Sequence, residues 1–143
     1  MMMKEMVEFQ LEVAEEKTMT FIDEALKNCH SGEEFVQAMA SVYEYPEVRN
    51  NLKDYPEWIR NIIAIVDYDT ELQMEGLECK FYHDVIEVLC VMGLDDEAEV
   101  LSVLCPNSTD ETIAMCTDKL ALYNDYDAFW NQVFLYAEKN LLG

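Results

Sequence analysis

Apolar residues recur along this chain at the i, i+3, i+4 spacing of a helical face, which leaves few folds open to it. Strict alternation of apolar and polar residues, which is typical of half-buried strands, is hard to find. Only four glycines and three prolines interrupt the 143 residues. The sequence therefore predicts an all-α fold.

Capping signals divide the chain into about six to eight helices. Ser31 with Glu34 and Ser108 with Glu111 are capping-box pairs, and each pair predicts that a helix begins there. Gly93 is predicted to end a helix in the left-handed conformation, and Asp95 to cap the next one. The expected helices cover residues 4–29 (as one helix or as two), 31–45, 54 through Leu72, 78–92, 95–104, 109–122 and an aromatic-rich segment around 129–141.

The helix that begins near Asp54 is expected to be the central one. Asp54 is its N-cap candidate, Pro56 suits a first turn, and Glu57 lies near the positive end of the helix dipole. On a helical wheel, the apolar residues of this helix leave only one polar wedge. These apolar residues are Trp58, Ile59, Ile62, Ile63, Ile65, Val66 and Leu72. We expect this helix to be largely buried in a single domain formed by residues 1–143.

Two later helices are expected to supply the rest of the core. Each carries apolar residues on one helical stripe. The first set is Phe81, Val85, Val88, Leu89 and Met92, and the second is Phe129, Trp130, Val133, Phe134, Ala137 and Leu141.

Composition favours a folded protein of the cytoplasm. An apolar fraction of 51% is too high for intrinsic disorder, although the net charge is −21. The longest strictly aliphatic run, Ile62 to Val66, is far shorter than the roughly 20 residues that cross a bilayer. The start of the chain lacks the pattern of a secretion signal. The five cysteines form an odd set without a C-x-x-C pair, which favours reduced thiols.

Acidic residues dominate the middle of the chain. Between Asn61 and Asp118 there are fourteen Asp and Glu residues and one basic residue, Lys80. Ordinary surfaces mix the two signs of charge, because like charges repel one another in the compact state. Nucleic acids and anionic lipids are held by Lys and Arg, so neither a nucleic acid nor a membrane is expected as a direct partner. The expected partner is a basic protein.

The segment from Glu71 to Phe81, followed by a helix, a glycine and a short helix, resembles the central signature of the bacterial DNA-mimic (DMP-like) family. The matching residues are Glu71, Leu72, Gly76, Leu77 and Phe81, whereas Met74, Glu75 and Cys79 stand where that family has Asn, Gly and Gln. The resemblance covers about residues 54–104, with a looser likeness in the last helix. It implies an all-helical acidic protein that presents carboxylates to a DNA-binding protein as a decoy for duplex DNA.

Six acidic residues are the candidate partner-binding site: Asp67, Glu71, Glu75, Glu78, Asp84 and Glu87. The first four share the polar wedge of the central helix at intervals of about 6 Å, provided that the helix continues past Gly76. Such like-charge pairs cost an isolated helix about 0.2 to 0.5 kcal/mol each, so a row of them suggests a binding role. Asp84 and Glu87 are expected to widen the row from the next helix.

Other functions remain open at this stage. An immunity-type or other interaction module would neutralise one cognate partner through a mixed aromatic and acidic surface, and the many tyrosines favour such contacts. The tyrosines in question are Tyr43, Tyr45, Tyr55, Tyr68, Tyr82 and Tyr126. Catalytic and metal-binding motifs are missing, so we expect no enzymatic activity, cofactor or metal, with a metal-dependent enzyme as the weakest alternative. A homodimer is compatible with the sequence.

Overall fold

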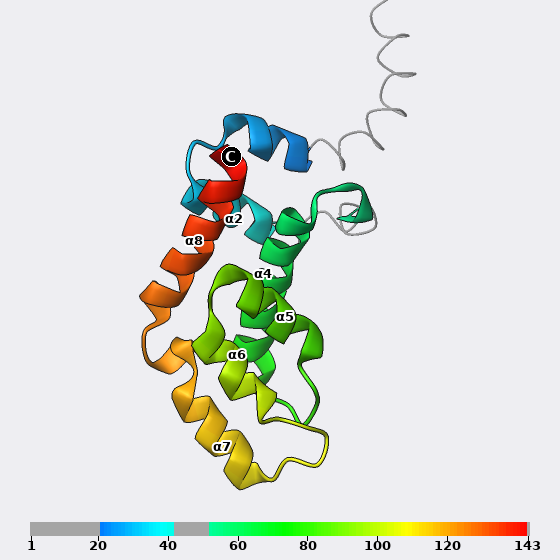
Figure 1. Cartoon of the computed structure of the whole chain (residues 1–143), viewed down its shortest axis with the longest axis vertical. Coiled ribbons are helices and arrows are strands. Elements are labelled where there is room, and N and C mark those ends of the chain that lie inside the picture. The colour runs from blue at the N-terminus through cyan, green and yellow to red at the C-terminus, as the bar shows by residue number, and fades with distance from the viewer. Residues whose placement is uncertain (1–20, 42–51, 143) are drawn as a thin grey trace, which may run out of the picture.

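The computed structural model describes residues 21–41 and 52–142, and in these ranges all regular structure is helical, which confirms the predicted all-α class. Residues 21–28 form the first helix. The elements that follow are α2 (Gly32–Ala40), the 3-10 helix η2 (Leu52–Asp54), α4 (Glu57–Glu75), α5 (His83–Met92), α6 (Asp95–Ser102), α7 (Asp110–Lys119), the 3-10 helix η3 (Ala121–Tyr123) and α8 (Tyr126–Leu142) (Figure 1).

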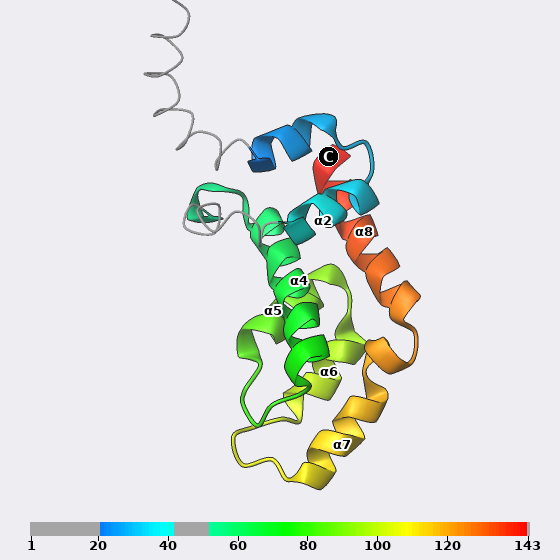
Figure 2. The same cartoon turned by 180° about the vertical axis from the view of Figure 1, so that it is seen from behind.

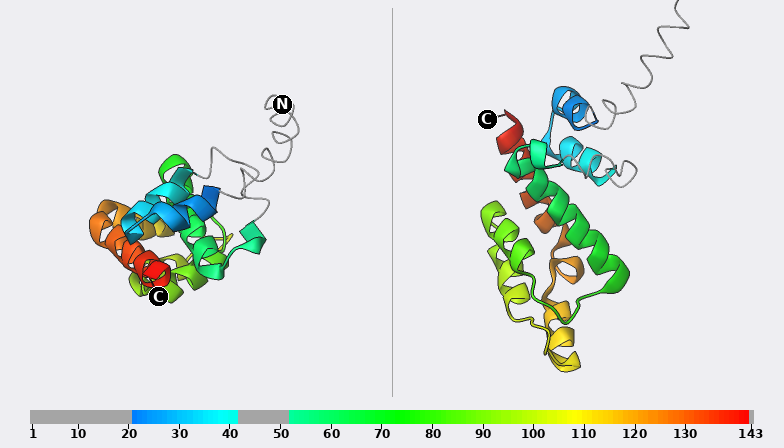
Figure 3. Two further views of the ribbon diagram at one scale, coloured as in Figure 1. Left: turned by 90° about the horizontal axis from the view of Figure 1, so that it is seen from above. Right: turned by 90° about the vertical axis from the view of Figure 1, so that its right-hand side faces the viewer.

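Helix α4 lies at the centre of the fold, as its apolar stripes predict. It packs against α2, α5 and α8. Its buried residues are Ile59, Asn61, Ile62, Ile63, Ile65, Val66, Tyr68 and Leu72. In Figure 1 helices α5 and α6 lie in front of α4, and in Figure 2 α4 lies in front of them. The right-hand view of Figure 3 shows α4 on one side of this half of the molecule and α5 with α6 on the other.

The capping box at Ser31 is confirmed. The Ser31 hydroxyl accepts a hydrogen bond from the Glu34 N–H at 3.2 Å, and α2 begins at the next residue. That residue, Gly32, is buried against α8, where its own N–H donates to the Glu138 carboxylate at 3.3 Å. The absence of a side chain therefore allows the start of α2 to lie directly on the backbone of α8. The rest of the two predicted N-terminal helices, residues 1–20 and 42–51, lies outside the described residues.

The predicted start of the central helix is wrong by two residues. Asp54 belongs to η2, where the Tyr55 N–H donates to the Leu52 carbonyl at 3.0 Å, and Pro56 takes the N-cap position without a side-chain hydrogen bond. At the other end α4 stops at Glu75, because Gly76 has a φ of 74° and ψ of −173°, a conformation that only glycine adopts readily. The helix therefore does not continue past Gly76.

Helix α5 begins at His83, five residues later than predicted. Residues 76–82 form an irregular connection in which the Lys80 N–H donates to the Glu78 carbonyl at 2.9 Å. Phe81 lies in this connection and is 55% exposed, so its assignment to the core is wrong. The remaining predictions for this helix hold: Leu89 and Met92 are buried, Val85 and Val88 are half-buried against the core, and Gly93 is a left-handed C-cap with φ of 85°.

The next two helix starts are each displaced by one residue. Leu94 is the N-cap of α6, so Asp95 lies in the first turn and makes no capping bond. Thr109 caps α7 by accepting from the Thr112 N–H at 3.1 Å. Ser108, the predicted cap, instead accepts from the Cys105 N–H at 2.9 Å. A neighbouring residue therefore takes the N-cap position in each loop, and only Thr109 makes a side-chain capping bond there.

The last helix supplies the predicted apolar stripe to the core. Phe129, Val133 and Ala137 are buried, and the other three members, Trp130, Phe134 and Leu141, pack against the core while half-buried. Helix α8 runs beside α2 at its C-terminal end (Figures 1 and 2). No helix in the described ranges has the length and apolar character needed to cross a membrane.

Candidate partner-binding surface

Three of the six candidate carboxylates lie on one stripe of α4. Asp67, Glu71 and Glu75 follow one another at four-residue intervals. Asp67 and Glu71 are half-buried, whereas Glu75 is exposed at the last residue of the helix. The predicted row on this helix therefore consists of three residues.

Glu78 lies beyond the helix, but Lys80 connects it to the row. The Lys80 ammonium is 2.6 Å from a carboxylate oxygen of Glu71 and 3.6 Å from one of Glu78. The hydrogen bond to Glu71 raises the pKa of Lys80, and the negative charges of Glu71 and Glu78 add to it. The same ammonium lies 5.0 Å from the centre of the Tyr82 ring. The one lysine in the acidic segment thus offsets charge at Glu71 and Glu78, within the predicted site.

Asp84 and Glu87 lie on α5, and both are exposed. Helix α5 packs against α4, and the right-hand view of Figure 3 shows the two helices in different layers of the domain. That Asp84 and Glu87 widen the row on α4 stays a prediction.

The tyrosines serve the interior more than the surface. Tyr68 is buried and donates to Glu97 at 2.8 Å, and Tyr82 is buried and accepts from the Glu78 N–H at 3.0 Å. The half-buried Tyr126 donates to Asp69 at 3.1 Å. Tyr55 is half-buried as well, and the two earlier tyrosines, Tyr43 and Tyr45, lie outside the described residues. The tyrosines predicted as contact residues are therefore not exposed wherever the structure describes them.

The sequence reasoning missed a buried carboxylate. Glu97 is 6% exposed, and besides the Tyr68 hydroxyl it accepts the backbone N–H of Ala121 at 3.1 Å. Burial raises its pKa, although both hydrogen bonds favour the charged form and act in the opposite direction. A usable signal was present, because Glu97 precedes the buried Leu101 by one helical turn and so shares its face.

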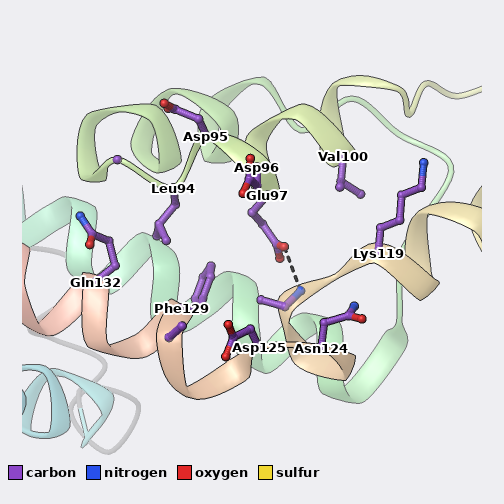
Figure 4. Close-up of a pocket in the computed structure, with 13 residues that line it drawn as sticks. Leu94, Asp95, Asp96, Glu97, Val100, Lys119, Asn124, Asp125, Phe129 and Gln132 are labelled. Carbon is purple, nitrogen blue, oxygen red and sulfur yellow. Dashed lines mark hydrogen bonds between the residues drawn. The ribbon is translucent and has the colours of Figure 1, made fainter.

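Glu97 lies in a pocket of about 660 Å³ between α6 and the start of α8. Figure 4 shows its carboxylate extending from α6 toward η3, with Asp96 above it and Asp125 below it. Leu94 and Phe129 provide apolar walls.

The five cysteines are free thiols. Cys79 and Cys105 come from different loops, and both contact Ser108. The Cys79 thiol donates to the Ser108 carbonyl at 3.4 Å, and the Ser108 hydroxyl donates to the Cys105 sulfur at 3.8 Å. In the described part of the chain, no group of three or more His, Cys, Asp or Glu side chains is arranged to hold a metal ion.

No protein-family model, curated protein or solved structure matches this chain.

Proposed function

We propose that this chain is a non-enzymatic acidic protein that binds a basic protein, one whose own basic surface otherwise holds nucleic acid. The observation that carries the proposal is the set of exposed carboxylates within residues 61–118, a segment in which Lys80 is the only basic residue. These carboxylates are Glu75, Asp84, Glu87, Asp95, Asp96, Glu99, Asp110, Glu111 and Asp118.

Electrostatics supports a partner of this kind. A surface built to hold phosphates presents Lys and Arg, and carboxylates satisfy the same groups with charge-assisted hydrogen bonds. Like-signed charges kept together without basic neighbours lower the stability of the free protein, and a basic partner relieves that repulsion. The resemblance to the DNA-mimic family points in the same direction.

The local charges indicate which carboxylates contribute most. Lys80 offsets Glu71 and Glu78, whereas Glu75, Asp84 and Glu87 have no ion pair with a basic residue among the described residues. The last three are therefore the members of the predicted site that we expect to contribute most to partner binding.

The test is displacement of DNA-binding proteins from immobilised duplex DNA. A bacterial lysate is loaded on the resin, which is then washed with this protein at low salt, and the released proteins are identified. We expect basic DNA-binding proteins to be released, with less release as the salt concentration rises. If the wash releases no more protein than an equal concentration of an unrelated acidic protein, the proposal is wrong.

Two triple variants distinguish between particular site residues and total charge as the cause of partner binding. The first changes Glu75→Gln, Asp84→Asn and Glu87→Gln. The matched control changes Glu24→Gln, Glu33→Gln and Glu57→Gln, which removes the same charge from exposed residues outside the acidic segment. We expect the first variant to lose most of the displacement and the control to keep it. Equal losses would mean that net charge alone is responsible.

A second candidate function is a module that neutralises one cognate partner through apolar and acidic contacts together. The observation in its favour is the end of α4 with the connection to α5, where Met74 is 76% and Phe81 55% exposed beside acidic residues. Phe81 also stacks on His83, with ring centres 4.9 Å apart. In this case a captured partner would be retained at high salt and released by Phe81→Ala, because buried apolar contacts are not screened by ions.

A further inference from the structure

The pocket between α6 and α8 is lined by hydrogen-bond acceptors. Asp95, Asp96 and Glu97 contribute carboxylates from α6, and Asp125 contributes one from the connection between η3 and α8. Asn124 donates through its side-chain nitrogen to the carbonyls of Leu120, at 2.6 Å, and Asp118, at 2.9 Å, so its side chain can offer a ligand only the amide oxygen. A ligand that satisfies these groups must supply hydrogen-bond donors, and a positive charge on them suits the carboxylates best.

The walls of the same pocket are apolar. Leu94 and Phe129 face one another across it in Figure 4, and Val100 and Ala128 also line it. These surfaces suit the methylene chain of a ligand, whose charged end then lies near the carboxylates. Lys119 is the single cationic side chain of the lining and extends from the far end.

We propose that this pocket binds an arginine side chain of the basic partner. A guanidinium has five N–H donors and no acceptor, and it is planar, so it can bond to carboxylates from two sides at once. The aliphatic part of arginine then lies against Leu94 and Phe129. The identity of the ligand as part of a partner rests on the proposed function, whereas recognition of the guanidinium by the pocket does not.

The first experiment titrates isotope-labelled protein with N-acetyl-arginine amide and follows backbone amide signals by NMR. We expect saturable changes at the residues that line the pocket, with weak affinity because a small ligand buries little surface. The control ligand is N-acetyl-citrulline amide, which keeps the shape but has no charge, and its binding should be at least about tenfold weaker. Equal binding of the two ligands, or changes spread over all acidic helices without saturation, would overturn the proposal.

Matched variants at the start of α8 test the carboxylates. Asp125→Asn should weaken binding of the arginine derivative by about fivefold, a typical effect of one partly exposed ion pair. Asp127→Asn removes the same charge two residues away from an exposed side chain outside the pocket, and it should leave the affinity unchanged. If the two variants weaken binding equally, the arginine derivative is attracted by the net negative charge of the protein and not by the pocket, which would overturn the proposal. Tighter binding of N-acetyl-lysine amide than of the arginine derivative would overturn the choice of guanidinium.

A pocket-filling variant separates this inference from the proposed function. Ala128 is exposed on α8 and lines the pocket, so Ala128→Leu narrows it without a change in charge. We expect this variant to lose the arginine derivative and to release fewer proteins from immobilised DNA. If the native protein releases DNA-binding proteins but does not bind the arginine derivative, this inference alone fails. If it binds the derivative and releases nothing, the proposed function fails and the pocket remains a guanidinium site.

Discussion

At the scale of single residues, Glu97 joins three elements through one carboxylate. It belongs to α6, accepts from Tyr68 of α4 and accepts from the backbone of η3. A buried carboxylate without a cationic partner is costly to keep charged, and burial accordingly raises the pKa of Glu97. The same geometry fixes α6 against the rest of the fold, since the Tyr68 hydroxyl and the Ala121 N–H donate to no other acceptor among the described residues.

Two substitutions at Glu97 are expected to have opposite effects. Glu97→Ala leaves both donors without an acceptor and should lower the free energy of unfolding by about 2 kcal/mol at neutral pH. Glu97→Gln keeps an acceptor for Ala121 and a polar partner for Tyr68 without the charge, so its stability should equal or exceed that of the native protein. Urea unfolding followed by circular dichroism measures both, and a Gln variant as unstable as the Ala variant would contradict this account.

The pH dependence of the same pair has a defined sign. The folded-state pKa of Glu97 lies above its ordinary value of 4.5, so the folded protein binds the proton more tightly than the unfolded chain. The stability that protonation contributes is complete below 4.5 and is lost as the pH rises through the folded-state pKa. The stability advantage of Glu97→Gln over the native protein should therefore grow as the pH rises through this window and then level off. A constant difference between pH 4 and pH 8 would show that Glu97 does not titrate differently in the two states.

Lys80 gives a prediction in which loss of a residue strengthens function. Its ion pairs with Glu71 and Glu78 join side chains that are about 40% exposed, so Lys80→Gln should cost less than about 1 kcal/mol of stability. The variant also frees two carboxylates of the acidic surface. We expect it to release DNA-binding proteins from immobilised DNA at higher salt than the native protein does. Lys27→Gln, which removes the same charge from an exposed residue of the first helix, is the control and should change release less.

At the scale of elements, two glycines are required for different reasons. A Cβ at Gly32 would collide with the backbone of α8 at the Phe134 carbonyl oxygen and lie 2.7 Å from the Glu138 nitrogen. Gly76 has open space around it but has a φ of 74°. The first therefore sets the approach of two helices, and the second ends one helix.

Alanine at these two positions should produce distinguishable defects. Gly32→Ala must separate α2 from α8 and should lower the free energy of unfolding by at least about 2 kcal/mol. Gly76→Ala introduces only backbone strain, about 1 to 3 kcal/mol. Hydrogen exchange locates the damage, and we expect faster exchange in α2 and α8 for the first variant and near residue 76 for the second. An unchanged α2 in Gly32→Ala would contradict the close approach of α2 and α8.

At the scale of the whole molecule, the net charge of −21 opposes the compact state. Added salt screens repulsion between carboxylates more than about 10 Å apart at 0.1 M. The melting temperature should therefore rise between about 0.02 and 0.5 M NaCl. The rise should be smaller for the triple variant of Glu75, Asp84 and Glu87. A melting temperature that is independent of salt would show that the carboxylates do not repel one another appreciably in the folded state.

Partner binding should respond to salt in the opposite direction. The ions that stabilise the free protein also screen its attraction to a basic surface. If binding of DNA-binding proteins weakens over the salt range in which the melting temperature rises, both effects come from the same carboxylates. Binding that survives the salt range would favour the cognate-partner module with Phe81 as its anchor.

The sequence by itself determined the elements that depend on neighbours within a few residues. The spacing of Ile59, Ile62 and Val66 identified the central helix because one helical face repeats every three to four residues. Ser31 marked the start of one helix, because its hydroxyl caps the adjacent backbone. Gly93 marked the end of another, because a residue without a side chain adopts the left-handed conformation readily. The acidic bias between Asn61 and Asp118 was also visible without coordinates.

The tertiary structure alone decided how those carboxylates are used. Whether Glu78 extends the row depended on the conformation of Gly76, and the position of Lys80 between Glu71 and Glu78 followed from it. The burial of Glu97 required a tyrosine 29 residues earlier and a backbone N–H 24 residues later. Contacts between residues that are distant in the sequence have no period or cap to reveal them, so only the folded chain shows which charges reach the surface.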